Sequence, residues 1–273
     1  MSSTAVPTLQ AVEVDVREGI GRVMLNRPEA LNAWNHQLGV DLLAAVTHVA
    51  SSADVRAVIV SGAGRAFSSG ADLKDLTGGE GERTPSGRPD VQRTLTERYH
   101  PIIAAIRTMP KPVIAAVQGP AVGIGLSLAL SCDLVVATES AYFLLAFVNI
   151  GLVPDGGSSL FVPNRVGMAR AAEMAMLGER VPAAQALQWG LINRVVADAE
   201  LDTEVGTLAR RLADGPALSF AGIKQALNRW QLRGMDEQLA LEARLQQEMI
   251  ESDDFLEGVT AFTEKRAPRF TGR

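Results

Sequence analysis

The chain has 273 residues, of which 47% are apolar and 21% charged, and it contains 25 glycines and 13 prolines. This composition is that of a globular protein and excludes fibrous and disordered chains, while the length allows one large or two small domains. The net charge of −5 argues against nonspecific binding to nucleic acid or to an anionic membrane, because both need a basic surface.

The predicted elements, taken in chain order, alternate between strands and helices. Residues 12–17 and 22–26 are predicted to form a β-hairpin with 18–21 as its turn, and apolar residues at helical spacing predict a helix over 35–50. A buried strand (55–60), a helix ending near Met109, a strand (113–117), a helix from about Gly123 and a strand (134–137) follow. This alternation indicates an α/β fold with a mainly parallel sheet covered on both faces.

Two further segments differ from this pattern. Residues 77–90 are rich in Gly, Glu, Arg, Pro and Ser without apolar periodicity, which predicts a mobile loop. Beyond Pro182 the strand signal nearly vanishes, and helices are predicted over 201–212, 217–230, 235–250 and 255–266. The C-terminal third is therefore expected to be helical.

The N-terminus and the cysteine content favour a cytoplasmic protein. Residues 1–10 lack the basic and apolar regions of a secretory signal, and the single cysteine, Cys132, cannot form a disulfide within the chain. Residues 112–132 are uncharged and long enough for a membrane span. Glycines and a proline in mid-course divide this run into a strand, a turn and a helix, so no membrane segment is expected.

Several kinds of chemistry are excluded by the residues present. The three histidines, His36, His48 and His100, and the one cysteine have no metal-ligand spacing, so no metal site is expected. A serine-hydrolase elbow around Ser127 would need a histidine downstream, and all three lie upstream. A dinucleotide fingerprint beginning at Gly123 would need a third glycine where the chain has Leu128.

Three glycine-bearing segments remain, over residues 66–73, 118–125 and 150–157, and each follows strand-like sequence. The second opens a helix, so its free N–H groups and the helix dipole favour negative charge nearby. The alternative is that the glycines serve only to allow tight turns.

Together these segments resemble the crotonase (enoyl-CoA hydratase/isomerase) superfamily, over residues 12–270. The motifs that carry the resemblance are Leu25-Asn-Arg-Pro-Glu-Ala-Leu-Asn32, Gly70-Ala-Asp-Leu73, Lys111-Pro-Val-Ile-Ala-Ala-Val-Gln-Gly119, Ser131-Cys-Asp-Leu134 and Ala261-Phe-Thr-Glu-Lys-Arg266. The resemblance implies a ClpP-like spiral of ββα units over 1–200 with the CoA site. It also implies a helical region over 201–273 that joins subunits into a trimer or a dimer of trimers. The substrate would be an acyl-CoA thioester, with coenzyme A as part of the substrate and no separate cofactor.

In this family two main-chain N–H groups hold the thioester oxygen, and the matching positions are Ala71 and Ile124. Members that add water to a double bond use two glutamates, whose positions here are Ser127 and Phe147. The remaining local carboxylate is Asp155, where the resembling isomerases carry an aspartate base. Residues implied to contact CoA or substrate are Arg27, Ala30, Leu31, Ala66, Ser68, Asp72, Leu73, Ser127, Phe147 and, from a neighbouring subunit, Lys265.

One carboxylate beside an oxyanion hole suits a proton shuttle, so we expect an isomerase that moves the double bond of an enoyl-CoA or opens a ring epoxide. The closest resemblance is to the phenylacetate-pathway branch. An enoyl-CoA hydratase with an unforeseen acid and a non-catalytic acyl-CoA-binding homologue stay open. Asp155 could also be a nucleophile with His100 as its base. A further alternative is that Asp155 is the N-cap of a helix beginning at Gly156. Glu97 is a further candidate on the loop side of the pocket.

Overall fold

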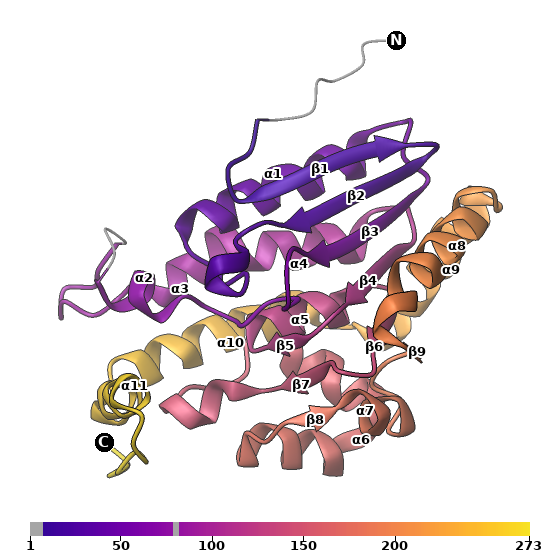
Figure 1. Cartoon of the computed structure of the whole chain (residues 1–273). Coiled ribbons are helices and arrows are strands. Elements are labelled where there is room, and N and C mark those ends of the chain that lie inside the picture. The colour runs from indigo at the N-terminus through magenta and orange to yellow at the C-terminus, as the bar shows by residue number, and fades with distance from the viewer. Residues whose placement is uncertain (1–7, 79–81) are drawn as a thin grey trace.

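The computed structural model describes residues 8–78 and 82–273. Its main sheet has six strands in the order β1-β2-β3-β4-β6-β9. Their bounds are β1 (Val12–Arg17), β2 (Ile20–Leu25), β3 (Ala57–Gly62), β4 (Val113–Val117), β6 (Leu134–Thr138) and β9 (Arg194–Val196). Only the β1–β2 pair is antiparallel within this sheet, which confirms the predicted mainly parallel arrangement (Figure 1).

The first hairpin turns more tightly than predicted. Only Glu18 and Gly19 lie between the strands, with φ of 51° and 79°, and Arg17 pairs with Ile20. A two-residue turn with both φ values positive matches the twist of the flanking strands and favours glycine. The second strand therefore begins two positions before the predicted one.

A second, three-stranded sheet was not predicted. It consists of β5 (Pro120–Val122), β7 (Tyr142–Leu144) and β8 (Val181–Pro182). These strands, like β9, are two or three residues long, which is too short for an alternating pattern to be visible. β5 occupies the stretch predicted as a Gly/Pro turn, and its carboxyl end leads directly into the next helix.

Helices cover both faces of the main sheet. α1 (His36–Ser51), α4 (His100–Thr108) and α5 (Ile124–Ser131) contribute to the larger apolar core, and Asn35 caps α1 by accepting the N–H of Leu38 at 2.9 Å. On the other face α8 (Leu201–Ala213) packs against β3 and β4 through a separate cluster that includes Ile59, Ile114 and Val205. The remaining short helices are η1 (Pro28–Ala30), α2 (Leu73–Gly78), α3 (Val91–Thr94), η2 (Leu95–Tyr99), η3 (Ala146–Ile150), α7 (Ala183–Gln188) and η4 (Asp198–Glu200).

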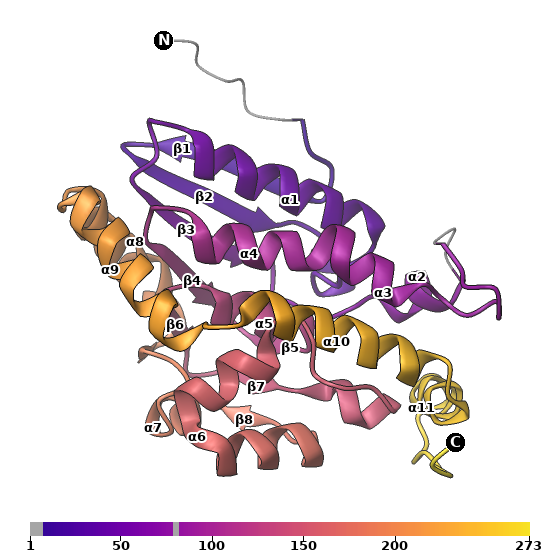
Figure 2. The ribbon, with the colours of Figure 1, turned by 180° about the vertical axis from the view of Figure 1, so that it is seen from behind.

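The other long helices after β7 are α6 (Ser158–Leu177), α9 (Ala217–Gln231), α10 (Met235–Ile250) and α11 (Asp253–Glu264). The four helices predicted in the C-terminal third correspond to α8, α9, α10 and α11, and their bounds are confirmed to within about two residues. Figure 2 shows α10 running across one face of the molecule between α9 and α11, which lie at opposite ends. α10 packs against α3, η2 and α6, so the two predicted regions, 1–200 and 201–273, are in contact, and their division stays a prediction.

The segment predicted as a mobile loop is partly structured. Residues 79–81 lie outside the described residues, Gly78 ends α2, and Arg83 forms a β-bridge with Pro89. The hydroxyl groups of Thr84 and Ser86 donate to the carboxylate of Glu251 at 3.0 and 2.6 Å. These partners are 165 or more positions apart, so local sequence could not reveal them.

None of the helices in the described part of the chain is long and apolar enough to cross a membrane. Over the same residues no group of three or more His, Cys, Asp or Glu side chains is arranged to hold a metal ion.

Candidate active site

The first two glycine-bearing segments run side by side in parallel. Ser68 forms a β-bridge with Ala121. The N–H of Ser68 donates to the carbonyl of Pro120 at 3.0 Å, and the carbonyl of Ser68 accepts the N–H of Val122 at 2.9 Å. Ala71 and Ile124 each follow the bridged pair by three residues. This register places the two amide groups next to each other.

Glycine is required where the segments meet. Gly70 has a φ of 96°, and a Cβ there would lie 3.1 Å from the carbonyl oxygen of Val122. Gly123 has a φ of 53°, and its Cβ would lie 3.8 Å from the Cα of Gly70. A side chain would be strained at either position, and the close approach of two backbones explains these glycines better than tight turns alone.

The amide groups of Ala71 and Ile124 are free to donate. The N–H of Trp34 donates to the carbonyl of Gly70 at 2.8 Å, and the N–H of Asp72 donates to the carbonyl of Trp34 at 3.0 Å. The N–H of Ala71 has no acceptor within the described residues. Ile124 is the first residue of α5, so its N–H is one of those that a helix leaves unpaired, at the positive end of its dipole. Two adjacent donors of this kind can bind an oxygen that carries negative charge.

The segment that contains Asp155 packs against the first turn of α5. A Cβ on Gly156, whose φ is 61°, would collide with the side chain of Ile124 and lie 2.9 Å from the Cβ of Ser127. The hydroxyl of Ser127 donates to the carbonyl of Asp155 at 2.7 Å. The third segment is therefore in contact with the first turn of α5.

The carboxyl group of Asp155 is buried and only half partnered. Its Oδ2 accepts a hydrogen bond of 2.7 Å from the side-chain amide of Gln246, whereas its Oδ1 has no partner among the described residues. Burial raises the pKa of Asp155 to about 7, and the charge of Glu242 adds to that rise. A carboxyl group with such a pKa can both take up and release a proton near neutral pH.

Asp155 is not the N-cap of the following helix, so that alternative was wrong. α6 begins at Ser158 with Gly157 at the N-cap. The carboxylate of Glu242 on α10 accepts hydrogen bonds from the N–H of Gly157 at 2.7 Å and from the N–H of Ser159 at 3.1 Å. The hydroxyl of Ser159 also donates to this carboxylate. Burial raises the pKa of Glu242 to about 7 despite these hydrogen bonds.

These buried carboxyl groups make stability depend on pH. Asp155 has a pKa of 3.8 when exposed and about 7 in the fold, so the folded chain binds the proton more tightly and stability falls as pH rises across that window. The free energy of unfolding of wild type should fall between about pH 4 and about pH 8, whereas that of Asp155→Asn should lack this contribution. We therefore expect the difference between the two to change in favour of Asp155→Asn by on the order of 4 kcal/mol over this range. Denaturant unfolding at several pH values measures this difference. A difference independent of pH would contradict the raised pKa.

The two positions at which hydratases carry glutamate hold no acid in this site. Ser127 is fully buried, with its hydroxyl bonded to Asp155, and Phe147 is 8% exposed with its ring 3.7 Å from a Cβ placed on Gly123. Phe147 therefore lies against the turn at Gly123, whereas Ser127 lies within the first turn of α5.

Three of the residues expected to contact CoA, Arg27, Ala30 and Leu31, lie against residues 69–72 of the first glycine-bearing segment. Arg27 does not point freely toward solvent, because its guanidinium pairs with Asp72 at 3.1 Å and donates to the carbonyl of Ala33. Ala30 and Leu31 are half-buried and close to Ser69, whose N–H donates to the carbonyl of Leu31 at 2.9 Å.

The other predicted contacts are less accessible or more distant. Ala66 and Ser68 are fully buried, so their side chains do not line an open pocket in this structure. Leu73 is the first residue of α2 and is half-buried. Lys265 is exposed at the end of α11, and its placement against a neighbouring subunit stays a prediction.

Neither His100 nor Glu97 forms a hydrogen bond with Asp155 among the described residues. Burial alone lowers the pKa of His100 to about 4, and its Nε2 has no hydrogen-bond partner within 8–78 and 82–273. Glu97 is exposed and paired with Arg93 at 2.9 Å. The residue of this region that does lie close to Asp155 is Tyr99, whose pKa is raised by burial and further by the charge of Asp155.

Two α10 residues that hold the Asp155 segment, Glu242 and Gln246, were not predicted as site residues. Both belong to the buried face of α10, together with Leu239, Ala243 and Ile250. Two polar residues four positions apart on an otherwise apolar stripe were the available signal, because buried polar groups need partners.

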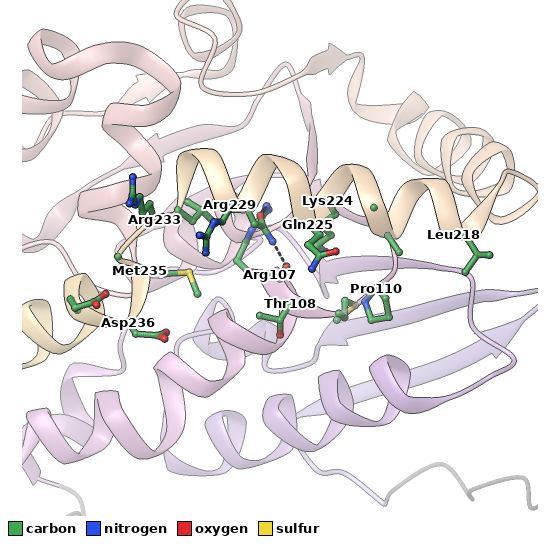
Figure 3. A pocket seen from close by; sticks show the side chains of 17 residues that line it. Arg107, Thr108, Pro110, Leu218, Lys224, Gln225, Arg229, Arg233, Met235 and Asp236 are labelled. Atoms are coloured by element: carbon green, nitrogen blue, oxygen red, sulfur yellow. Dashed lines mark hydrogen bonds between the residues drawn. The ribbon is translucent and has the colours of Figure 1, made fainter.

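A groove of about 1000 Å³ lies elsewhere, between the end of α4 and α9 (Figure 3). Arg107, Lys224 and Arg229 contribute to its wall, and Lys224 is itself bonded to Asp133 at 2.8 Å. Ala71, Ile124 and Asp155 do not line this groove, so it is not the candidate active site.

Comparison with known proteins agrees with this geometry. The family model described as enoyl-CoA hydratase/isomerase matches residues 15–273. The chain belongs to this family. A probable enoyl-CoA hydratase of Rhodobacter capsulatus is 43% identical over 96% of this chain and 98% of its own length. The 1,2-epoxyphenylacetyl-CoA isomerase of Escherichia coli is 40% identical over 94% and 97%.

Solved structures of the family share the fold. The crystal structure of an enoyl-CoA hydratase from Mycobacterium avium subsp. paratuberculosis has a TM-score of 0.87 and 40% identity, over 97% of this chain and all of that one. The predicted crotonase fold with helices at the C-terminus is thereby confirmed, as is membership of an enzyme family of hydratases and isomerases.

Proposed function

We propose that this protein is an enoyl-CoA isomerase, which shifts a double bond of an acyl-CoA thioester with Asp155 as its single base. The observation that carries the proposal is the buried Oδ1 of Asp155, which has no partner among the described residues and belongs to a segment packed against the first turn of α5. The amides of Ala71 and Ile124 are free to donate, and Ser127 and Phe147 stand where a hydratase carries its acids. Hydration needs groups that activate water and protonate carbon, whereas isomerisation needs one group that moves one proton.

The reaction follows from the positions of these groups. The carboxylate of Asp155 removes a proton from the α-carbon of a 3-enoyl thioester, and the electron pair moves into the thioester carbonyl, giving a dienolate. The N–H groups of Ala71 and Ile124 donate to the resulting oxyanion. The carboxylic acid then returns the proton to the γ-carbon, which leaves the double bond between the α- and β-carbons. No water and no separate cofactor enter the balance.

The thioester carrier is coenzyme A in this proposal, and its nucleotide contacts residues near the oxyanion turn. Ala30, Leu31 and Leu73 line its path, and Arg27 can turn to a phosphate only by leaving Asp72. Lys265 contributes from a second subunit of a trimer or a dimer of trimers. Exposed large apolar side chains on α6 and α9, namely Met168, Met176, Leu218 and Trp230, support such an assembly, because burial at an interface would remove them from water.

The substrate test uses purified protein with a 3-enoyl-CoA, a 2-enoyl-CoA and a ring-epoxide CoA thioester in separate assays. We expect conversion of the 3-enoyl to the 2-enoyl thioester with little hydration of the latter. Turnover of the epoxide would extend the proposal to the reaction after which the Escherichia coli relative is named. Fast hydration without isomerisation would replace the proposal by a hydratase. Tight acyl-CoA binding with all assays blank would replace it by a binding protein.

A further inference from the structure

Helix α10 supplies the only side-chain hydrogen bond to the carboxyl group of Asp155 within the described residues. The donor is the side-chain amide of Gln246, which is 91 positions away in sequence and 1% exposed. This buried polar side chain is distant from Asp155 in sequence but in direct contact with its carboxyl group. Such a contact calls for a functional explanation as well as a structural one.

The orientation of the Gln246 amide is fixed from its other end. Its Oε1 accepts the main-chain N–H of Val153 at 3.1 Å, and its Nε2 donates to Oδ2 of Asp155 at 2.7 Å. Rotating the amide by 180° would place an NH₂ group against the N–H of Val153 and an oxygen against the carboxylate. Both contacts would be lost, so the donor always faces Asp155.

This arrangement distinguishes the two oxygens of the carboxyl group. Oδ2 is occupied by Gln246, whereas Oδ1 is buried without a partner. A hydrogen bond to one oxygen of a carboxylate favours its ionised form and fixes the plane of the group. The same hydrogen bond lowers the pKa of Asp155 against the larger effect of burial.

We propose that Gln246 is a positioning residue that orients the carboxylate of Asp155, keeps Oδ1 free for the substrate proton and favours the ionised base. This rests on the proposed function, because it concerns the base of that reaction. The other titratable groups that face Asp155 are Glu242 on α10 and Tyr99 on η2. The adjoining α5 and η3 carry no charged residue.

The test replaces Gln246 by methionine, which has a similar length and no hydrogen-bond donor. We expect the acid limb of the pH profile of kcat/KM to move up by about one pH unit and kcat near neutral pH to fall about tenfold. KM for the 3-enoyl thioester should stay within about twofold, because Gln246 does not contact substrate. Gln246→Glu should move the limb further, since an ionised glutamate repels the carboxylate.

The matched control is Gln247→Met, one position along the same helix. Gln247 accepts the N–H of Gln92 at 3.1 Å and donates to Pro89 and Glu251, without contact to Asp155. Its profile should coincide with that of wild type. The positioning role would be overturned if the acid limb of folded Gln246→Met is unchanged. It would also be overturned if the variant loses activity and has a lower melting temperature without any shift of that limb.

A readout independent of activity separates this inference from the proposed function. Carbon-13 NMR of protein labelled at the aspartate carboxyl groups gives the pKa of Asp155 directly, with its signal assigned by its absence in Asp155→Asn. We expect the pKa to be about one unit higher in Gln246→Met than in wild type or Gln247→Met. An unchanged pKa would overturn the inference whatever the enzyme catalyses. A raised pKa in a protein without isomerase activity would overturn the proposed function alone.

Discussion

Asp155→Asn is expected to lower the rate of 3-enoyl-CoA isomerisation by roughly 10²–10⁴-fold, the range typical of losing a general acid–base group. Asparagine keeps the volume of the side chain and can accept the hydrogen bond from Gln246, but it cannot take up the α-proton. Substrate affinity should change little, because the oxyanion donors and the CoA contacts are untouched. Steady-state kinetics with the 3-enoyl thioester measures the effect.

The control for this substitution is Asp236→Asn, an exposed aspartate in the first turn of α10. It changes the net charge equally and should retain wild-type turnover. Circular dichroism and the melting temperature establish that Asp155→Asn is folded. Wild-type turnover in the folded variant would show that the base has been assigned to the wrong residue.

Ile124→Pro is expected to lower the same rate by roughly 10²–10³-fold, because it removes one of the two main-chain donors to the oxyanion. Proline is tolerated at the first position of a helix, where the N–H has no partner within the helix and the fixed φ is already helical. The substitution therefore deletes the donor while leaving α5 in place. The loss should appear mainly in kcat, since the charge on the oxygen develops in the transition state.

The companion variant is Ile124→Val, which shortens the buried side chain and keeps the N–H. Because the side chain of Ile124 is only 2% exposed, this variant measures the effect of reduced side-chain packing without loss of the N–H. We expect it to retain activity within a few-fold of wild type, with destabilisation of about 1 kcal/mol. Equal activity of the proline and valine variants would exclude the Ile124 amide as an oxyanion donor.

The sequence carries much of the information about the strands and helices, and less about how they meet. Apolar periodicity located α1 and α10 to within about two residues, because a helix face is set by local spacing. Strands of two or three residues, such as β8 and β9, give no such pattern and depend on neighbours distant in sequence.

The candidate site divides in the same way. Ala71, Ile124 and Asp155 each adjoin a glycine in a motif that can be recognised locally, and the structure brings their segments together. The partner of Asp155 could not be predicted, because the spacing of Glu242 and Gln246 shows which face of α10 they share and not what that face packs against. For Arg27 the family resemblance implied a contact with CoA, and the structure shows an ion pair with Asp72 that the local sequence does not reveal.

The dependence of the Asp155 segment on α10 has a consequence for synthesis on the ribosome. The strands of the main sheet are complete once β9, ending at Val196, has emerged, but Glu242 and Gln246 are translated about fifty residues later. Until α10 docks, the N–H groups of Gly157 and Ser159 lack their carboxylate and Asp155 lacks its amide partner. The hydrogen bond that α10 donates to the carboxyl group of Asp155 therefore forms only when almost the whole chain has been made.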